Sequence, residues 1–317
     1  MIARELIAPP PYAEDVQLGL FGSQKTLPCK LFYDRAGSAL FEQITRLPEY
    51  YPTRTELEIL CGHGAEIAKE VRPGVTVVEL GSGTATKTTT LLQAFSRRQM
   101  RVPYVPVDIS PAALAEAQER VQSQCTRVSV RPVVADFSQG FGFLRNIRGR
   151  KLVLYLGSSI GNFDPGPAVE MLSQIRSQLA PGDALLLGTD LVKDPSILVP
   201  AYDDAQGITA QFNKNILARL NRELGANFDL SFFRHIAAWS PVKSRIEIYL
   251  ESLRPQVVDL GLLNSRVKLA NGERIHTENS YKYTMPMVRE MLELSGFSLD
   301  ASWFDDRTWF ALHLARV

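Results

Sequence analysis

From Val75 onward the chain alternates short apolar runs with amphipathic segments, and this rhythm limits the possible folds more than any other feature. Such alternation is typical of a parallel sheet covered by helices. The helix after the second strand has a clear start, because Ser110 suits an N-cap and Pro111 suits the first helical position. The expected strands are residues 75–80, 105–108, 128–136, 151–156 and 184–190. The sequence therefore predicts an α/β fold.

The pattern changes after residue 193. Residues 205–224 predict one long helix, with apolar side chains at helical spacing, and residues 245–251 alternate strictly between apolar and polar. Residues 267–277 contain Asn271-Gly272, a strong hairpin signal. This region therefore predicts antiparallel sheet with one helix.

The first style returns near the C-terminus, with a capped helix from Thr284 to Gly296 and two strands within 298–315. We therefore expect an α/β domain interrupted by an inserted α+β domain. The α/β domain comprises residues 57–193 and 282–317, and the second domain comprises 1–56 and 194–281.

Composition narrows the choice of partner and compartment. The chain has 317 residues, enough for two domains, and a formal net charge of +1, which argues against a nucleic-acid partner. Its three cysteines suggest neither a disulfide framework nor a metal site, and its four histidines show no ligand spacing, so we expect no metal. No apolar run is long enough to span a membrane, and the first residues lack the apolar core of a signal peptide. We expect a cytoplasmic monomer without a membrane partner.

A nucleotide-like site is predicted where the expected parallel strands end. Gly81 and Gly83 follow the first strand and precede a helix, while Asp108, Asp136 and Phe137 follow the next two strands. Ligands of open α/β sheets bind at these carboxyl ends. One carboxylate there would accept ribose hydroxyls, and the next would accept an adenine amine beside the aromatic ring.

Two cofactors fit this pattern, a nicotinamide dinucleotide and S-adenosylmethionine. The dinucleotide fingerprint needs a third glycine where Thr86 stands, and an acidic residue about 20 positions on. Asp108 lies 27 positions after Gly81. The spacing therefore favours S-adenosylmethionine.

Five segments carry a more specific signal. They are residues 31–41 (LFYDRAGSALF), 44–54 (ITRLPEYYPTR), 79–87 (ELGSGTATK), 157–163 (GSSIGNF) and 277–283 (TENSYKY). Together they closely resemble the histidine-specific Nα-methyltransferases of ergothioneine biosynthesis, from about residue 27 to the C-terminus. The resemblance implies a class I methyltransferase (Rossmann-like) sheet with an inserted substrate domain. It also implies transfer of three methyl groups from S-adenosylmethionine to the α-amine of L-histidine, giving hercynine.

The same resemblance implies roles for individual residues. Asn162 and Tyr202 would hold the substrate carboxylate, with Gly157 beside the amine and Tyr33 relaying a proton from the amine through water. Tyr33 and Asn162 are therefore the expected catalytic residues. The remaining expected substrate contacts are Glu278 and Ser280 on the imidazole, Tyr50 and Thr209 in the same pocket, Ile248 in the wall nearest the substrate side chain, and Phe41 with the tyrosines near the methylammonium. The expected cofactor contacts are Gly81, Gly83, Lys87, Asp108, Asp136 and Phe137.

One position departs from the family pattern. Ile248 stands where histidine-specific members resemble each other in having methionine, and a β-branched side chain is stiffer. This departure supports one alternative, an Nα-methyltransferase acting on tryptophan, tyrosine or a peptide N-terminus. Two alternatives that do not depend on Ile248 also stay open: a non-catalytic ligand-binding regulatory subunit and a nicotinamide-dependent dehydrogenase.

Overall fold

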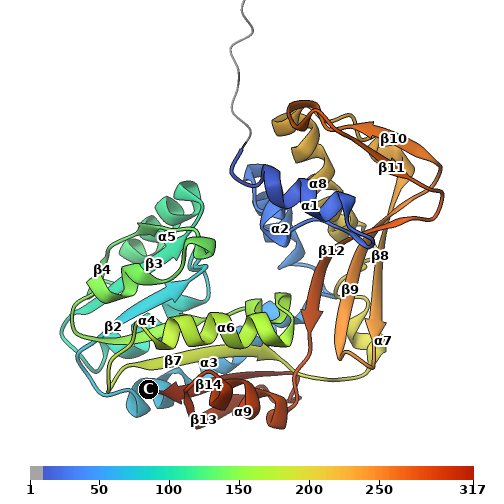
Figure 1. Ribbon diagram of the computed structural model, residues 1–317. Coiled ribbons are helices and arrows are strands. Elements are labelled where there is room, and N and C mark those ends of the chain that lie inside the picture. Colours follow the sequence, from blue (N-terminus) through green and yellow to red (C-terminus); the bar gives the residue numbers. More distant parts are fainter. Residues whose placement is uncertain (1–9) are drawn as a thin grey trace, which may run out of the picture. The chain divides into compact units, whose positions relative to one another are not determined.

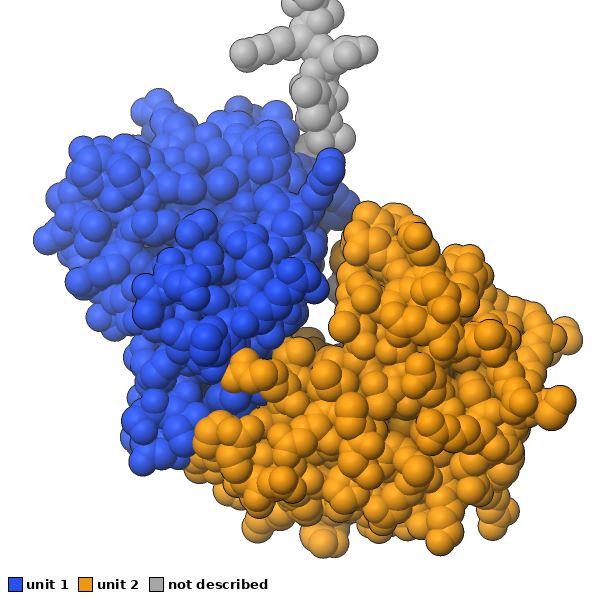
Figure 2. Space-filling model, turned by 180° about the vertical axis from the view of Figure 1, so that it is seen from behind, with its two compact units in different colours: residues 1–51, 194–280 blue, residues 52–193, 281–317 orange. Residues whose placement is uncertain are grey.

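The computed structural model describes residues 10–317, and the chain divides into two compact units (Figures 1 and 2). Unit 1 comprises residues 1–51 and 194–280, and unit 2 comprises 52–193 and 281–317. The expectation about a signal peptide concerns residues 1–16, of which 1–9 lie outside the described residues. No helix in the described range is both long enough and apolar enough to cross a membrane.

Unit 2 is built on one mixed sheet in the order β13-β14-β7-β6-β2-β3-β4, with β5 also paired to β3. The parallel strands are β2 (Val75–Leu80), β3 (Val102–Asp108), β4 (Val128–Val130), β5 (Val133–Val134), β6 (Arg150–Tyr155) and β7 (Ala184–Asp190). β14 (Phe310–Arg316) pairs antiparallel with β7, and β13 (Ser298–Phe304) pairs antiparallel with β14. The predicted α/β sheet and its closing pair of strands are confirmed.

Helices cover both faces of this sheet (Figure 1). On β2, Val75 and Val77 pack with α3 (Tyr51–Glu70), α4 (Thr88–Ser96) and α5 (Pro111–Gln124). Val78 and Leu80 pack with α6 (Pro165–Arg176), α9 (Met285–Leu294) and the 3-10 helix η3 (Gly142–Asn146). Every residue of β2 is buried, including the polar Thr76 and Glu79, as expected for a parallel strand covered on both faces.

Unit 1 combines helices with two small sheets. The helices are α1 (Ala13–Phe21), η1 (Cys29–Phe32), α2 (Arg35–Ile44), α7 (Pro195–Leu198), α8 (Ile208–Leu224), η5 (Leu230–Phe232) and η6 (Gly261–Leu263). One sheet has the order β1-β12-β9-β8: β1 (Lys25–Thr26), β12 (Arg274–Tyr281), β9 (Arg245–Ser252) and β8 (Phe233–Ser240). The other pairs β10 (Gln256–Asp259) with β11 (Arg266–Leu269). The apolar face of α8, including Phe212, Ile216 and Leu220, packs in the core of this unit.

Three local predictions need correction. The expected strand 128–136 is two short strands, β4 and β5, because Pro132 between them cannot donate to the ladder. The long helix begins at Ile208 rather than at residue 205. Gly207 before it has a left-handed backbone (φ 71°), and the Asp204 carboxylate accepts the first helical N–H groups.

The predicted hairpin at Asn271-Gly272 is the third correction. The turn itself forms, since Glu273 N–H donates to Ala270 O (3.2 Å) and Gly272 has φ 77°. However, β11 pairs with β10, whereas β12 lies between β1 and β9. The backbone after the turn bonds to the end of β9 instead, with Ser252 N–H donating to Glu273 O (2.9 Å). The turn therefore joins two sheets.

Candidate cofactor and substrate sites

The glycine loop between β2 and α4 has an open, left-handed backbone. Gly81 has φ 69° and Gly83 has φ 49°, and a Cβ added at either would meet nothing within 4 Å. Glycine is thus favoured here by backbone conformation, and the space beside the loop leaves room for a ligand. The loop is tied to the neighbouring strand, because Gly81 N–H donates to Val107 O (2.8 Å).

Asp108 at the end of β3 supports this loop. One carboxylate oxygen accepts from Gly83 N–H (2.9 Å) and the other from Ser110 N–H (2.9 Å). Each carboxylate oxygen has a second lone pair, so acceptor capacity for a ribose hydroxyl remains. Asp108 therefore shapes the loop in addition to its predicted role.

Asp136 and Phe137 follow the next strand. Asp108 is in register with Val134 of β5, and Ala135 N–H donates to Asp108 O (3.1 Å), so the two strand ends are adjacent. Phe137 stacks on Phe141 with ring centroids 5.5 Å apart. The structure thus brings the predicted adenosine contacts, Gly81, Gly83, Asp108, Asp136 and Phe137, to neighbouring strand ends.

A buried glutamate that the sequence did not reveal joins two predicted site residues. Glu56 on α3 is completely buried, and its carboxylate accepts from the Lys87 ammonium and from Gly157 N–H (2.7 Å). Gly188 on β7 leaves room for it, since a Cβ there would lie 2.5 Å from Glu56 Oε1. Helix α3 lies far from both partners in sequence, so no local pattern marks Glu56 as part of this cluster.

The loop after β6 carries two of the predicted amine contacts. Gly157 has φ 74°, and Asn162 ends the 3-10 helix η4 (Ser159–Asn162). The neighbouring Gly161 packs tightly on the backbone of Tyr281, where an added Cβ would lie 3.0 Å from the carbonyl oxygen. Asn162 is half-buried.

Glu79 is a second buried carboxyl near the glycine loop. It accepts from Thr88 Oγ1 (2.6 Å) and from the Tyr104 hydroxyl. Burial raises the pKa of Glu79 to about 7. A buried carboxyl thus lies at the end of β2, two residues before Gly81.

In unit 1, aromatic side chains predicted to contact substrate form one cluster. The Tyr33 and Phe41 rings are 5.9 Å apart, Phe41 and Tyr50 are 6.2 Å apart, and Tyr50 and Tyr202 are 6.2 Å apart. Phe212 of α8 contacts both Tyr33 and Phe41, each at 5.9 Å. Tyr33 is more than one-third exposed.

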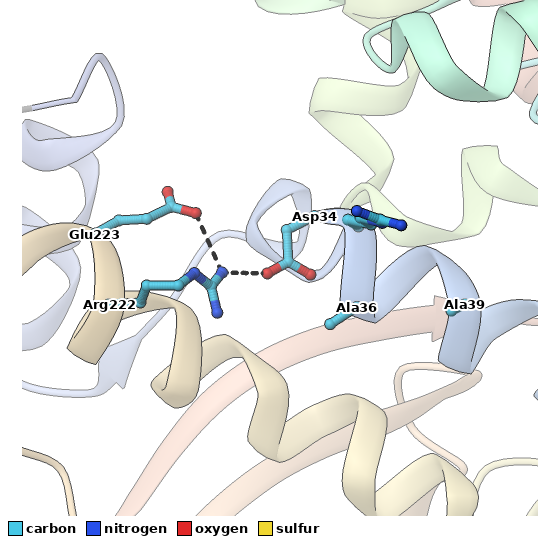
Figure 3. Close-up of a pocket in the computed structure, with 6 residues that line it drawn as sticks. Asp34, Ala36, Ala39, Arg222 and Glu223 are labelled. Carbon is cyan, nitrogen blue, oxygen red and sulfur yellow. Dashed lines mark hydrogen bonds and ion pairs between the residues drawn. The ribbon is translucent and has the colours of Figure 1, made fainter.

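A hollow in unit 1 lies next to Tyr33 in sequence but contains none of the predicted site residues (Figure 3). Its lining residues are Asp34, Arg35, Ala36, Ala39, Arg222 and Glu223. Asp34 caps α2 by accepting from Gly37 N–H (2.7 Å), and it also accepts from Asn215 Nδ2 (2.8 Å) and Arg222 Nη2 (2.5 Å) on α8. These bonds fix the start of α2, and with it the position of Tyr33.

The polar residues predicted for the imidazole lie on β12. Glu278 and Ser280 share one face of the strand, since side chains alternate along it. The Ser280 hydroxyl is 2.8 Å from the Tyr202 hydroxyl. Ile248 is buried on β9.

Thr209 in the first turn of α8 is nine-tenths buried. Its N–H donates to Asp204 Oδ1 (2.7 Å). Its hydroxyl, although close to that carboxylate, forms no hydrogen bond of normal geometry with any described residue. An orphaned buried hydroxyl is costly unless a ligand or water completes it.

The four histidines give no sign of a metal centre. His313 is buried between Thr189 Oγ1 and Ser302 Oγ, each at 2.8 Å, and burial lowers its pKa to about 4. His235 is also buried in a hydrogen-bonded setting. Within residues 10–317, no group of three or more His, Cys, Asp or Glu side chains is arranged to hold a metal ion.

The strand order, the glycine loop and the acidic strand ends define a class I S-adenosylmethionine-dependent methyltransferase fold. The family model described as "histidine-specific methyltransferase, SAM-dependent" matches residues 12–317, and the chain belongs to this family.

Curated relatives extend the match over nearly the full length. The chain is 45% identical over 301 residues to a histidine N-alpha-methyltransferase of Mycolicibacterium smegmatis, covering 95% of this chain and 93% of the relative. A protein of the same name from Mycobacterium tuberculosis is 44% identical over the same shares. Ergothioneine biosynthesis protein 1 of Neurospora crassa is 31% identical over 285 residues. The aligned region covers 88% of this chain but 32% of that relative.

The chain also aligns with a solved structure of magnesium protoporphyrin IX methyltransferase from Synechocystis with bound SAH. The alignment covers 90% of this chain and 95% of the Synechocystis chain. Its TM-score is 0.48 and its sequence identity 13%.

Proposed function

We propose that this protein transfers methyl groups from S-adenosylmethionine to the α-amine of L-histidine, forming hercynine as a step of ergothioneine biosynthesis. Full-length membership in the histidine-specific family carries this proposal, with 45% identity over 95% of the chain to a histidine N-alpha-methyltransferase. The family is one of enzymes, which argues against a non-catalytic subunit. Its donor is S-adenosylmethionine, which argues against a nicotinamide-dependent dehydrogenase.

The chemistry asks for positioning more than for proton abstraction. S-adenosylmethionine supplies an electrophilic methyl group on its sulfonium. The attacking species is the neutral α-amine, whose lone pair must lie in line with the methyl group. Each of the first two transfers leaves an ammonium that must lose a proton before the next. After the third transfer the nitrogen has neither a lone pair nor a proton, so the reaction stops by itself.

In unit 2, the strand ends supply the donor site in this proposal. Asp108 accepts ribose hydroxyls through its spare lone pairs, Asp136 accepts the adenine amine, and Phe137 covers the ring. Gly81 and Gly83 allow close approach to the backbone. The open space beside both glycines supports this assignment. Lys87 contributes a cation to this site, held in place by the buried Glu56.

The loop after β6 contributes to substrate binding in this proposal. Gly157 lies beside the amine, and the amide of Asn162 contacts the amine and the substrate carboxylate.

In unit 1, Glu278 and Ser280 recognise the imidazole in this proposal. A carboxylate accepts a ring N–H and favours the charged ring, while a hydroxyl bonds the second nitrogen. Thr209 lines the same pocket in this proposal, and its buried hydroxyl, which lies near the Asp204 carboxylate, can also bond a polar ligand. Tyr202 holds the carboxylate, and its bond to Ser280 links two predicted contacts.

The aromatic cluster suits the cationic intermediates. Phe41, Tyr33 and Tyr50 supply ring surface to which methylammonium groups are attracted by cation–π interaction. Tyr33 is the exposed member and passes the amine proton to solvent through water.

The experiment that tests the proposal is mass spectrometry of the purified protein incubated with S-adenosylmethionine and an equimolar mixture of the twenty amino acids. We expect only histidine to gain three methyl groups. Methylation of tryptophan or tyrosine instead would contradict the substrate assignment and leave the donor intact. That outcome has a precedent among relatives, since a 4-dimethylallyltryptophan N-methyltransferase of Trichophyton verrucosum is 27% identical over 92% of this chain. No methylated product would contradict the proposal as a whole.

Glu278→Gln tests the imidazole assignment. A hydrogen bond to a charged group contributes about 1.5–3 kcal/mol, so the KM for histidine is expected to rise at least about tenfold. The Kd for S-adenosylmethionine should stay unchanged. Glu14→Gln, at an exposed position of α1, is the matched control and should leave both constants unchanged. Equal KM values for wild type and Glu278→Gln would contradict the assignment.

We further propose that the enzyme works as a cytoplasmic monomer without a metal. Size-exclusion chromatography coupled to light scattering tests whether the protein is a monomer. Activity after exhaustive chelation tests whether it needs a metal. A dimer, or activity lost on chelation and restored by a metal, would contradict these expectations.

A further inference from the structure

Three buried polar side chains connect three elements of unit 1. Asn213 lies on α8, His235 on β8 and Thr277 on β12, and each is at least nine-tenths buried. Asn213 Nδ2 is 2.9 Å from His235 Nδ1, and Thr277 Oγ1 is 2.8 Å from Asn213 Oδ1. We call these three residues the Asn213–His235–Thr277 network.

The contacts of this network decide which atoms donate and which accept. Asn213 Nδ2 donates to Tyr249 O (3.0 Å) and to His235 Nδ1, which uses both of its protons, while its Oδ1 accepts from Thr277. A flipped amide would place its oxygen against the Tyr249 carbonyl oxygen and lose that bond. His235 Nδ1 is therefore the acceptor, and its Nε2 carries the proton and donates to Tyr202 O (2.8 Å).

The network contacts the backbone of residues to which the proposed function assigns substrate contacts. His235 holds the backbone of Tyr202. The single proton of the Thr277 hydroxyl, donated to Asn213 Oδ1, has the backbone carbonyl of Ile248 as a second, longer acceptor (3.2 Å). Thr277 immediately precedes Glu278 on β12 and faces the opposite side of the strand. The strand is thus anchored from within the unit while Glu278 and Ser280 face away from the anchor.

We infer that His235 is a positioning residue that, through Asn213 and Thr277, sets the relative placement of Tyr202, Ile248 and Glu278 and so determines affinity for the acceptor amino acid. This inference rests on the proposed function. The His235 ring must be neutral, because a protonated Nδ1 would oppose the Asn213 amide protons. Burial lowers the pKa of His235 below its usual range and outweighs the nearby Asp203 and Asp204 carboxylates, while Lys214 adds to the lowering.

The first test compares His235→Phe with His235→Gln. Phenylalanine keeps the shape but leaves a buried Asn213 proton and the Tyr202 carbonyl unpaired, so we expect the KM for histidine to rise about tenfold. Glutamine offers one acceptor and one donor and should restore part of the loss. The Kd for S-adenosylmethionine should not change in either variant. His63→Phe, at a half-buried site on α3 in unit 2, is the control and should match the wild-type KM. An unchanged KM in folded His235→Phe would overturn the inference.

Two further measurements test the inference if His235→Phe cannot be studied. If His235→Phe does not fold, Thr277→Val removes one hydroxyl from the network at nearly constant shape, and an unchanged KM there overturns the inference. Nitrogen-15 NMR of histidine-labelled wild type reads the tautomer directly, and a proton on Nδ1 of His235 would also overturn it. If the wild type methylates a different amine, the proposed function fails, and the same variants are then measured with that amine as acceptor.

Discussion

The two units hold their predicted site residues by different means. In unit 2 the interior contains paired charges, including Glu56 with Lys87, and Asp190 with Lys193 and Lys282. In unit 1 the Asn213–His235–Thr277 network is neutral and works through side-chain bonds to backbone carbonyls. Breaking one partner of a buried ion pair leaves an uncompensated charge, whereas breaking a neutral network leaves only an unpaired polar group. Substitutions in unit 2 should therefore act first on stability, and those in unit 1 first on substrate affinity.

Asp190→Asn should show the largest effect. Asp190 and Lys282 are fully buried, with Asp190 Oδ2 2.8 Å from Lys282 Nζ and Asp190 Oδ1 2.5 Å from Lys193 Nζ. Removal of the carboxylate charge leaves two poorly solvated ammonium groups, so the free energy of unfolding should fall by about 3–5 kcal/mol. Urea denaturation measures this. Asp300→Asn, which breaks an exposed pair with Arg316, is the control and should cost less than about 1 kcal/mol.

The same carboxylate predicts how stability responds to acid. Burial alone would raise the pKa of Asp190, but the Lys282 and Lys193 ammonium groups hold it below its usual range. A carboxyl whose pKa is lowered on folding stabilises the protein above its unfolded pKa and loses that contribution as pH falls through the folded pKa. Wild type and Asp190→Asn should therefore converge in stability under strongly acidic conditions. A constant difference would contradict the ion-pair account.

The buried carboxyl of Glu79 predicts that stability changes with pH in the opposite direction. Burial raises its pKa to about 7, so between the unfolded value of 4.5 and pH 7 the folded state binds a proton that the unfolded state has lost. Stability should therefore fall as pH rises through this window, by roughly 1–3 kcal/mol, and level off above it. Glu79→Gln carries no titrating proton, so the difference between variant and wild type should change across this window alone. Thermal unfolding from pH 4 to 9 measures it.

Much of unit 2 could be predicted because its signals are local. The apolar runs that form β2 and β7 appear in the sequence at their observed bounds, and the Ser110-Pro111 start of α5 is confirmed by the bond from Ala113 N–H to Ser110 Oγ (3.3 Å). The roles of the site residues stay predictions. The sequence does not mark Glu56 and Asn213, because a buried polar residue on an amphipathic helix has the same local pattern as a solvated one. Only their distant partners distinguish them.

Gly188→Ala tests whether the space around Glu56 is constrained. The added methyl would lie 2.5 Å from Glu56 Oε1 and 3.2 Å from the Phe310 ring, so the carboxylate must move away from Gly157 N–H. Overpacking of this kind costs about 1–3 kcal/mol. The Kd for S-adenosylmethionine should also rise, because Lys87 moves with its partner.

Gly62→Ala is the matched control for this substitution. Gly62 lies within α3, and an added Cβ there meets nothing within 4 Å. The helix should gain about 0.5–1 kcal/mol, since alanine has the higher helix propensity. The two alanine substitutions should thus change stability in opposite directions. A similar sign for both would contradict the close packing around Glu56.

Ile248→Met should have the smallest effect and bears directly on substrate choice. The side chain is buried on β9, and the swap nearly conserves volume, so stability should change by less than about 1.5 kcal/mol. The Thr277 hydroxyl holds the Ile248 carbonyl whatever the side chain, so the backbone of the wall stays in place. The KM for histidine should therefore change less than about threefold, an energy near that of a single weak contact. Ile246→Met, on the same face of β9, is the control. A much larger fall in KM in Ile248→Met, with tryptophan or tyrosine turnover lost, would show that position 248, rather than Glu278 and Ser280, selects the acceptor.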